Sequence, residues 1–175
     1  MTEATWALDL DALNTMAQSD FVAALGSTFE HSPWVAEGAW AARPFASLDA
    51  LHAAMIGVVR SAPRGTQVAF LCGHPELAGK EAQAGTMTRD SVGEQASAGL
   101  NALSQGEIGE LRELNARYRA RHGFPFIVAV RRHSKADIFN QLRSRLARDS
   151  EVELSEALAQ IAAITRLRVE ARVAA

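Results

Sequence analysis

Hydrophobic residues recur at spacings of three and four along most of the chain, which is the period of an amphipathic α-helix. The first such stretch begins at Ser19, and its apolar positions are Phe21, Leu25 and Phe29. A second begins at Ser32-Pro33, because proline suits the first helical position, and ends by Arg43-Pro44, because the residue before proline avoids helical angles. The pattern therefore predicts helices from the start of the chain.

Ser47 can cap a third helix that ends at Ala62-Pro63. The apolar residues on one face of this helix are Leu48, Leu51, Met55 and Val59. The run at residues 66–72 is too short for periodicity to separate helix from strand, and we favour a helix because its neighbours are helical.

Polar start signals mark three further helices in the second half of the chain. Ser104 with Glu107 forms a capping-box pattern, Ser134 precedes another helix, and Ser150 with Glu153 repeats the capping pattern for the last helix. No repeat and no linker rich in proline, glycine or serine divides the chain. We therefore expect an all-α fold, one compact multi-helix domain over residues 1–175.

Composition narrows the class of protein. A chain of 175 residues, 48% hydrophobic, is long enough for one sizeable core. Lys and Arg number 18 against 20 Asp and Glu, so the net charge of -2 gives no overall attraction to nucleic acid or to an anionic membrane. One cysteine, no signal-peptide pattern and no apolar run long enough to span a bilayer together predict a cytoplasmic protein.

A polar, glycine-bearing stretch from Gly73 to Asp90 contains the first candidate for chemistry. His74 precedes Pro75, which disfavours helical angles and predicts an exposed, positioned imidazole. The alternative is a loop histidine that is solvated or hydrogen-bonded for structural reasons. Cys72 follows two large apolar residues, so we expect a buried thiol acting as a small hydrophobic group.

Two interpretations fit the next motif. Ser91 and Glu94 match a capping box, in which each satisfies a backbone donor of the other. On a helix, however, Ser91, Glu94, Gln95 and Ala98 share one side, which places a hydroxyl, a carboxylate and an amide beside a small residue. Such a face can bind a polar, planar ligand.

The final helix predicts one inward arginine. Its apolar stripe runs through Leu154, Leu158, Ile161 and Thr165 to Arg168. At about 100 degrees per residue, Arg168 stays within this stripe whereas Arg166 points away from it. A guanidinium on an apolar face needs a partner, either a structural carboxylate or carbonyl group or an anionic ligand, and the structural partner is the commoner case.

An apolar segment from Gly123 to Val128 follows a helix end with no obvious strand to pair with. The backbone donors around Phe126 and Ile127 therefore need other partners. These can be neighbouring helix ends and loops, or a carbonyl group of a bound ligand.

Residues 131–148 carry a local cluster of basic side chains. We expect 143–148 to form a solvated helix face, and acidic residues dilute the cluster. A helical nucleic-acid-binding regulator that uses this basic segment is the alternative function, although no helix-turn-helix pattern is clear.

Taken together, the motifs resemble the family of 2-oxo-4-hydroxy-4-carboxy-5-ureidoimidazoline (OHCU) decarboxylase, the last enzyme from urate to (S)-allantoin. The resemblance spans nearly the whole chain and depends on the order and spacing of several motifs. These are Trp40 with Arg43-Pro44-Phe45, His74-Pro75-Glu76-Leu77-Ala78-Gly79, Gly85-Thr86-Met87-Thr88, Ser91, Glu94-Gln95, Ala98-Gly99-Leu100, Leu114-Asn115, Tyr118, Gly123-Phe124-Pro125-Phe126 and Leu167-Arg168.

The resemblance implies a cofactor-free and metal-free decarboxylase, commonly a homodimer, acting on a small ureidoimidazoline. Its catalytic histidine and glutamate correspond to His74 and Glu94. Its substrate-contacting positions correspond to Ser91, Gln95 and Arg168, together with the backbone around Phe126 and Ile127. His122 stands where a phenylalanine is common in the family, which puts none of these residues in doubt.

Overall fold

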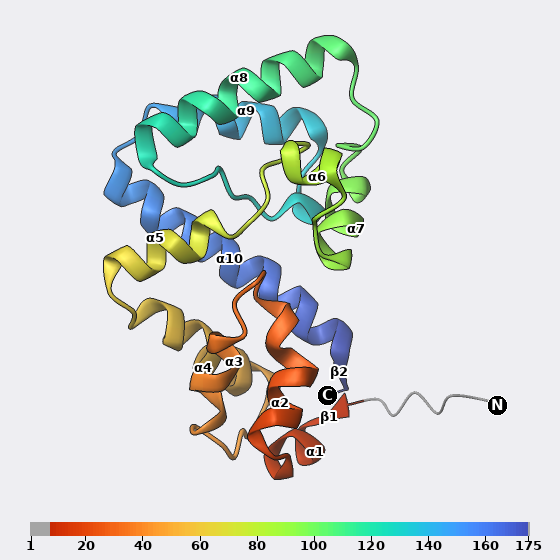
Figure 1. Ribbon diagram of the computed structural model, residues 1–175, viewed down its shortest axis with the longest axis vertical. Helices are drawn as coiled ribbons and strands as arrows, with labels where there is room; N and C mark the ends of the chain where they lie inside the picture. The colour runs from red at the N-terminus through yellow and green to blue at the C-terminus, as the bar shows by residue number, and fades with distance from the viewer. Residues whose placement is uncertain (1–7, 175) are drawn as a thin grey trace, which may run out of the picture. The chain divides into compact units, whose positions relative to one another are not determined.

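The computed structural model describes residues 8–174, which form ten α-helices and one pair of two-residue strands (Figure 1). The chain divides into two compact units. The first comprises the described residues up to Ala62 together with those from Thr165 onward, and the second comprises Pro63–Ile164. The expected all-α fold is confirmed, and each unit has its own set of buried residues.

The first unit joins the two ends of the described chain. Strand β1 (Leu8–Asp9) pairs in parallel with β2 (Val173–Ala174), and four helices follow β1. These helices are α1 (Leu10–Thr15), α2 (Gln18–Leu25), α3 (Trp34–Trp40) and α4 (Leu48–Arg60). A 3-10 turn, η1 (Gly26–Thr28), ends α2 early, so the prediction that Phe29 lies on this helix is wrong, although Phe29 is buried.

Helix α4 forms as its sequence predicts. The Ser47 hydroxyl accepts a hydrogen bond from the backbone N–H of Ala50 at 3.0 Å, which satisfies one of the donors that a helix start leaves without a partner. The apolar face of α4 is fully buried at Leu51, Met55 and Val59.

The second unit contains α5 (Arg64–Cys72), α6 (Lys80–Ala84), α7 (Arg89–Ser97), α8 (Gln105–His122), η2 (Val130–Arg132), α9 (Lys135–Leu146) and most of α10 (Ser150–Arg172). Helices α8 and α9 pack side by side (Figure 1). The helix favoured for residues 66–72 is confirmed by α5. No helix among residues 8–174 has the length and apolar character needed to cross a membrane.

Two of the predicted helix starts in this unit are capping boxes. Ser104 and Glu107 at the start of α8 bond each other's backbone N–H groups, and Gly123 ends the helix with φ of 84°, a value that glycine adopts without steric cost. Ser134 and Asp137 do the same for α9.

The predicted capping pair for α10 is wrong. The Asp149 carboxylate accepts from the N–H groups of Glu151 and Val152 at the start of this helix. Ser150 instead contacts His122, and Glu153 turns inward and is fully buried.

We expect the buried apolar side chains of the second unit to supply most of the stability of that unit. Leu142→Ala, on the buried face of α9, should lower the free energy of unfolding by about 2–5 kcal/mol because it leaves a cavity in a close-packed core. Val152→Ala is the matched control, since Val152 is 54% exposed and its truncation should change stability by less than about 0.5 kcal/mol. Urea unfolding followed by circular dichroism measures both, and equal losses would contradict the assignment of the core.

Candidate functional site

His74 lies directly after α5, where the last turn of the helix holds it. Its backbone N–H donates to the Leu71 carbonyl group at 3.1 Å, and its ring meets the Phe70 ring edge to face at 5.0 Å. Only 6% of His74 is exposed, so the prediction of an exposed imidazole is wrong. Gly73, the C-cap of α5, keeps helical angles, and the ring of His74 lies against Phe70 of that helix.

The contacts of His74 set its tautomer. Nδ1 lies 3.1 Å from the carbonyl oxygen of Phe70, which can only accept a hydrogen bond. Nδ1 therefore carries the proton in the neutral ring, and Nε2 presents its lone pair. A buried histidine arranged in this way can take up or deliver a proton through Nε2.

The loop that follows His74 is tied to α7 through one amide side chain. Gln95 Oε1 accepts from the backbone N–H of Ala78 at 2.8 Å, and Gln95 Nε2 donates to the Glu76 carbonyl group at 3.3 Å. Ala78 has φ of 47°, a left-handed conformation that costs a residue other than glycine about 1–2 kcal/mol. From α8, Asn115 Nδ2 donates to the Leu77 carbonyl group at 3.2 Å.

Helix α7 begins earlier than the capping-box interpretation requires. Thr88 is the N-cap, and its hydroxyl accepts from the Ser91 N–H at 3.3 Å, so Ser91 lies inside the helix. Ser91, Glu94 and Gln95 are at most 9% exposed and share the buried side of α7. The interpretation of Ser91 and Glu94 as a cap is therefore wrong. Ser91, Glu94 and Gln95 share one side of the helix as predicted, whereas Ala98 is the C-cap of α7.

The segment with Phe126 and Ile127 belongs to neither helix nor strand and is buried. Gln160 Oε1 accepts from the Ala129 N–H at 2.9 Å, and Arg145 donates to the Ile127 carbonyl oxygen at 2.9 Å. Among residues 8–174, no hydrogen bond is found for the backbone N–H groups of Phe126, Ile127 and Val128. Buried backbone donors almost always have partners, so these three N–H groups can receive a ligand.

Arg168 lies in the first unit and faces inward, as predicted. It is 6% exposed, and its Nη1 donates to Glu30 Oε2 at 3.1 Å and to the Thr28 carbonyl oxygen at 3.2 Å. Arg166 is more exposed and pairs with Asp49. The structural carboxylate expected for an inward arginine is therefore Glu30.

Within the second unit, a buried ion pair supports the Phe126 segment. Arg145 Nε and Glu153 Oε1 are 2.8 Å apart, and both side chains are at most 2% exposed. The Tyr118 hydroxyl donates to the same carboxylate oxygen at 2.6 Å. Burial, and then the neighbouring carboxylate, raise the pKa of Tyr118 far above its ordinary value, so this hydroxyl remains a donor.

Sequence reasoning missed this pair. The prediction that residues 143–148 form a solvated face is wrong for Arg145, which is only 2% exposed. The available indication was its position in the stripe of α9, three residues after Leu142 and seven after Ile138, both fully buried.

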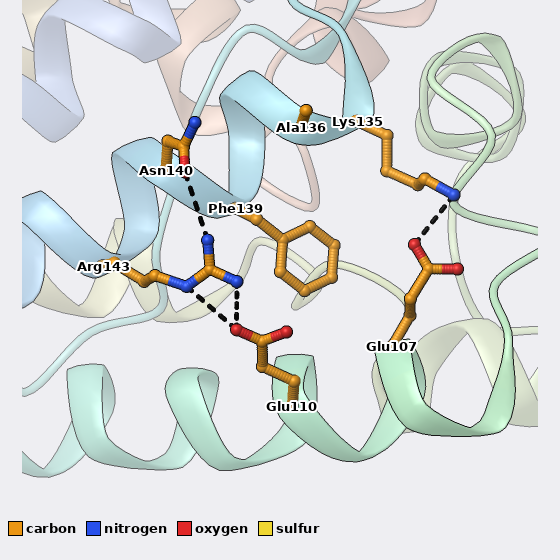
Figure 2. Close-up of a pocket in the computed structure, with 7 residues that line it drawn as sticks. All are labelled: Glu107, Glu110, Lys135, Ala136, Phe139, Asn140 and Arg143. Carbon is orange, nitrogen blue, oxygen red and sulfur yellow. Dashed lines mark hydrogen bonds and ion pairs between the residues drawn. The ribbon is translucent and has the colours of Figure 1, made fainter.

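Two side chains of the basic cluster are neutralised where α8 and α9 meet. Figure 2 shows Lys135 bonded to Glu107, and Arg143 bonded to Glu110, on either side of a shallow pocket lined by Phe139. Lys135, together with Ser104, lowers the pKa of the Glu107 carboxyl, which keeps it ionised. None of the predicted site residues lines this pocket, and its paired charges leave little attraction for a polyanion.

A second cavity, of about 370 Å³, borders Gln95 and Ala78. Most of its lining is apolar, with Met87, Leu100 and Leu103 among the contributors, which does not suit a ureido compound rich in polar groups. Cys72 is exposed, with its Sγ 3.4 Å from the Gly123 carbonyl oxygen, so the prediction of a buried thiol is wrong. Among the described residues, no three His, Cys, Asp or Glu side chains are grouped to hold a metal ion.

Comparison with known proteins identifies the family. The sequence model of the OHCU decarboxylase family matches residues 14–170. The uric acid degradation bifunctional protein PucL of Bacillus subtilis is 45% identical over 91% of this chain, and the chain spans 32% of that relative. The 2-oxo-4-hydroxy-4-carboxy-5-ureidoimidazoline decarboxylase of Mus musculus is 37% identical over 93% of this chain and 91% of its own length.

A solved structure gives the same answer for the fold. The crystal structure of (S)-allantoin synthase is similar over 95% of this chain and 54% of its own, with a TM-score of 0.74 and 26% identity. Because the family model covers residues 14–170 and the mouse relative is matched almost from end to end, this chain belongs to the OHCU decarboxylase family.

Proposed function

We propose that this protein decarboxylates 2-oxo-4-hydroxy-4-carboxy-5-ureidoimidazoline to (S)-allantoin and CO2 in the degradation of urate. The observation that carries the proposal is the link between two motifs: the loop after His74 is hydrogen-bonded to the Glu94-Gln95 face of α7. Family membership and the names of the relatives support the same substrate.

The substrate can supply its own electron sink. When the bond to the leaving CO2 breaks, its electron pair passes to the ring imine, and the ring then takes up a proton on one face. The protein must hold the carboxylate out of the ring plane, stabilise the charge that develops on the ring and direct the proton. These tasks need a proton carrier and several fixed hydrogen-bonding groups rather than a bound cofactor.

His74 is the proposed acid and base, acting through Nε2 on the 4-hydroxyl group or on the ring. Its Nδ1 is engaged by the Phe70 carbonyl oxygen, which orients the imidazole before substrate arrives. Glu94, buried on α7, would hold the N–H groups of the ureido arm or the ring, because a carboxylate accepts from two donors at once.

Ser91 and Gln95 would fix the orientation of the substrate on α7. One contact of Gln95 Nε2 is the Met87 sulfur at 3.3 Å, a weak acceptor that a ligand oxygen can replace without loss of the loop contacts. The N–H groups of Phe126 and Ile127 would bind ring or ureido oxygens, and the resemblance adds Arg168 to the substrate-binding residues.

We also propose that the protein is a homodimer, as the resemblance implies, that residues 1–175 act as one domain, and that it is located in the cytoplasm. The exposed thiol of Cys72 fits a reducing compartment.

Chirality of the product tests the proposal most directly. Freshly generated substrate decays slowly to racemic allantoin, which gives no net circular dichroism. The purified protein should build up the (S)-allantoin signal well ahead of this background. A signal that never exceeds the racemic background would contradict the proposed reaction.

His74→Asn should abolish decarboxylation and leave the helical spectrum intact, because asparagine fills part of the space but its amide cannot take up or release a proton near neutral pH. His133→Asn is the matched control, since His133 lies in the same unit, contacts Gln141 and has no proposed role. The rate of (S)-allantoin formation measures both variants. Normal turnover in His74→Asn would remove this residue from the catalytic machinery.

Glu94→Gln should reduce turnover at least about 100-fold with little change in melting temperature, because it replaces an acceptor with a group that must donate from one end. Glu107→Ala is the opposite case, because it removes a true capping-box carboxylate at the start of α8, so this variant should lose some melting temperature but keep its activity. If Glu94→Gln instead lost stability and kept turnover, Glu94 would be structural.

A further inference from the structure

Arg145 is the side chain that holds the Phe126-Ile127 segment from behind. Its Nη1 donates to the Ile127 carbonyl oxygen at 2.9 Å, and its guanidinium lies over the Phe126 ring at 4.6 Å. A single planar group thus contacts both the backbone and the side chain of this segment. Arginine is suited to this task because its donors have a fixed, planar geometry.

The guanidinium is itself fixed by two other helices. Glu153 on α10 accepts from Arg145 Nε at 2.8 Å, and Tyr118 on α8 donates to the same carboxylate oxygen at 2.6 Å. The Tyr118 ring also meets the Phe126 ring edge to face at 5.5 Å. Three helices therefore hold one irregular stretch of chain in place.

The hydrogen bond from Arg145 to the Ile127 carbonyl oxygen also orients the N–H group of Val128. The Ile127 C=O and the Val128 N–H belong to one planar, trans peptide unit, in which the two groups point in opposite directions. The Val128 N–H is therefore directed away from Arg145. It is one of the three buried N–H groups that have no hydrogen bond among the described residues.

We propose that Arg145, held by Glu153 and Tyr118, is a positioning residue that orients the backbone N–H groups of residues 126–128 toward the substrate. This inference rests on the proposed function, because those N–H groups matter for catalysis only if they bind the reacting ring. The ion pair thereby gains a role in the reaction, although it contains none of the proposed substrate-binding residues.

The double variant Arg145→Met with Glu153→Gln tests the proposal. It removes both buried charges together, which avoids leaving one unpaired, and glutamine keeps an acceptor for the Tyr118 hydroxyl. The turnover number kcat should fall about 100-fold, the size of effect expected when a reacting group is misplaced by about 1 Å. KM should change less, because the N–H groups act mainly on charge that develops in the transition state.

Arg143→Met with Glu110→Gln is the matched control, because it also removes an arginine of α9 together with its carboxylate partner on a neighbouring helix. This ion pair, drawn in Figure 2, lies at the surface, and the hydrogen bonds of Arg143 go to Glu110 and Asn140. The control should keep the wild-type kcat. If the double variant fails to fold, Arg145→Lys replaces it in the test. This variant retains the charge of the buried pair but lacks the planar donors, and its kcat should fall about 10-fold.

Amide hydrogen exchange of residues 126–128 provides a readout that does not depend on activity. Exchange should be faster in the Arg145 variants than in the wild type and unchanged in the Arg143 control. A folded Arg145 variant with wild-type kcat and wild-type exchange would overturn the proposal and leave the function standing. A wild-type protein without decarboxylase activity would instead overturn the function, and the exchange rates would still decide whether Arg145 orders the segment.

Discussion

Irregular backbone inside an all-helical unit must be held by side chains, and the proposed site depends on this constraint. Neither the loop after His74 nor the segment around Phe126 has a strand to pair with, since the strand pairing among residues 8–174 is that of β1 with β2. Side-chain amide and guanidinium groups supply the hydrogen bonds that a neighbouring strand would otherwise make. Gln95 bonds the backbone of Ala78 and Glu76, and Arg145 bonds the backbone of Ile127. Each such hydrogen bond contributes about 1 kcal/mol or more to the stability of the fold. Its more important effect is to fix the orientation of the backbone groups in these segments.

Buried charge is the cost of this arrangement. Bringing Arg145 and Glu153 out of water is unfavourable, and their attraction offsets that cost only because the geometry is close and both side chains make further hydrogen bonds. Tyr118 and the Ile127 carbonyl group supply two of these additional bonds. The same side chains that satisfy the ion pair therefore also order the segment that the pair supports.

The sequence predicted the helices well where local chemistry decides. Ser47, Ser104 and Ser134 cap the expected helices, and the period of α10 correctly separated the inward Arg168 from the more exposed Arg166. These features depend on residues within a turn or two of each other. The polar face of α7 was foreseen for the same reason, and its residues were linked to a site by the resemblance.

Predictions failed where distant residues decide. Asp149 caps α10 because Glu153 is drawn into the core by Arg145 and Tyr118, and neither contact is visible in a local pattern. His74, expected to be exposed, is buried, and Cys72, expected to be buried, is exposed. Periodicity reports a face of a helix, whereas burial after a helix end depends on the tertiary path of the chain.

The ion pair also restricts how this sequence can diverge. A substitution at Glu153 alone leaves the buried charge of Arg145 without its partner, at a cost of about 3–5 kcal/mol, which is a large share of the stability of an ordinary domain. A substitution at Arg145 alone leaves the buried Glu153 with only the more exposed Arg148, at 3.5 Å, as a cationic partner. Replacement of both by apolar residues can be nearly neutral for stability. Positions 145 and 153 are therefore expected to vary as a pair across evolution, with single exchanges removed by selection even in lineages where the rest of α9 and α10 drifts freely.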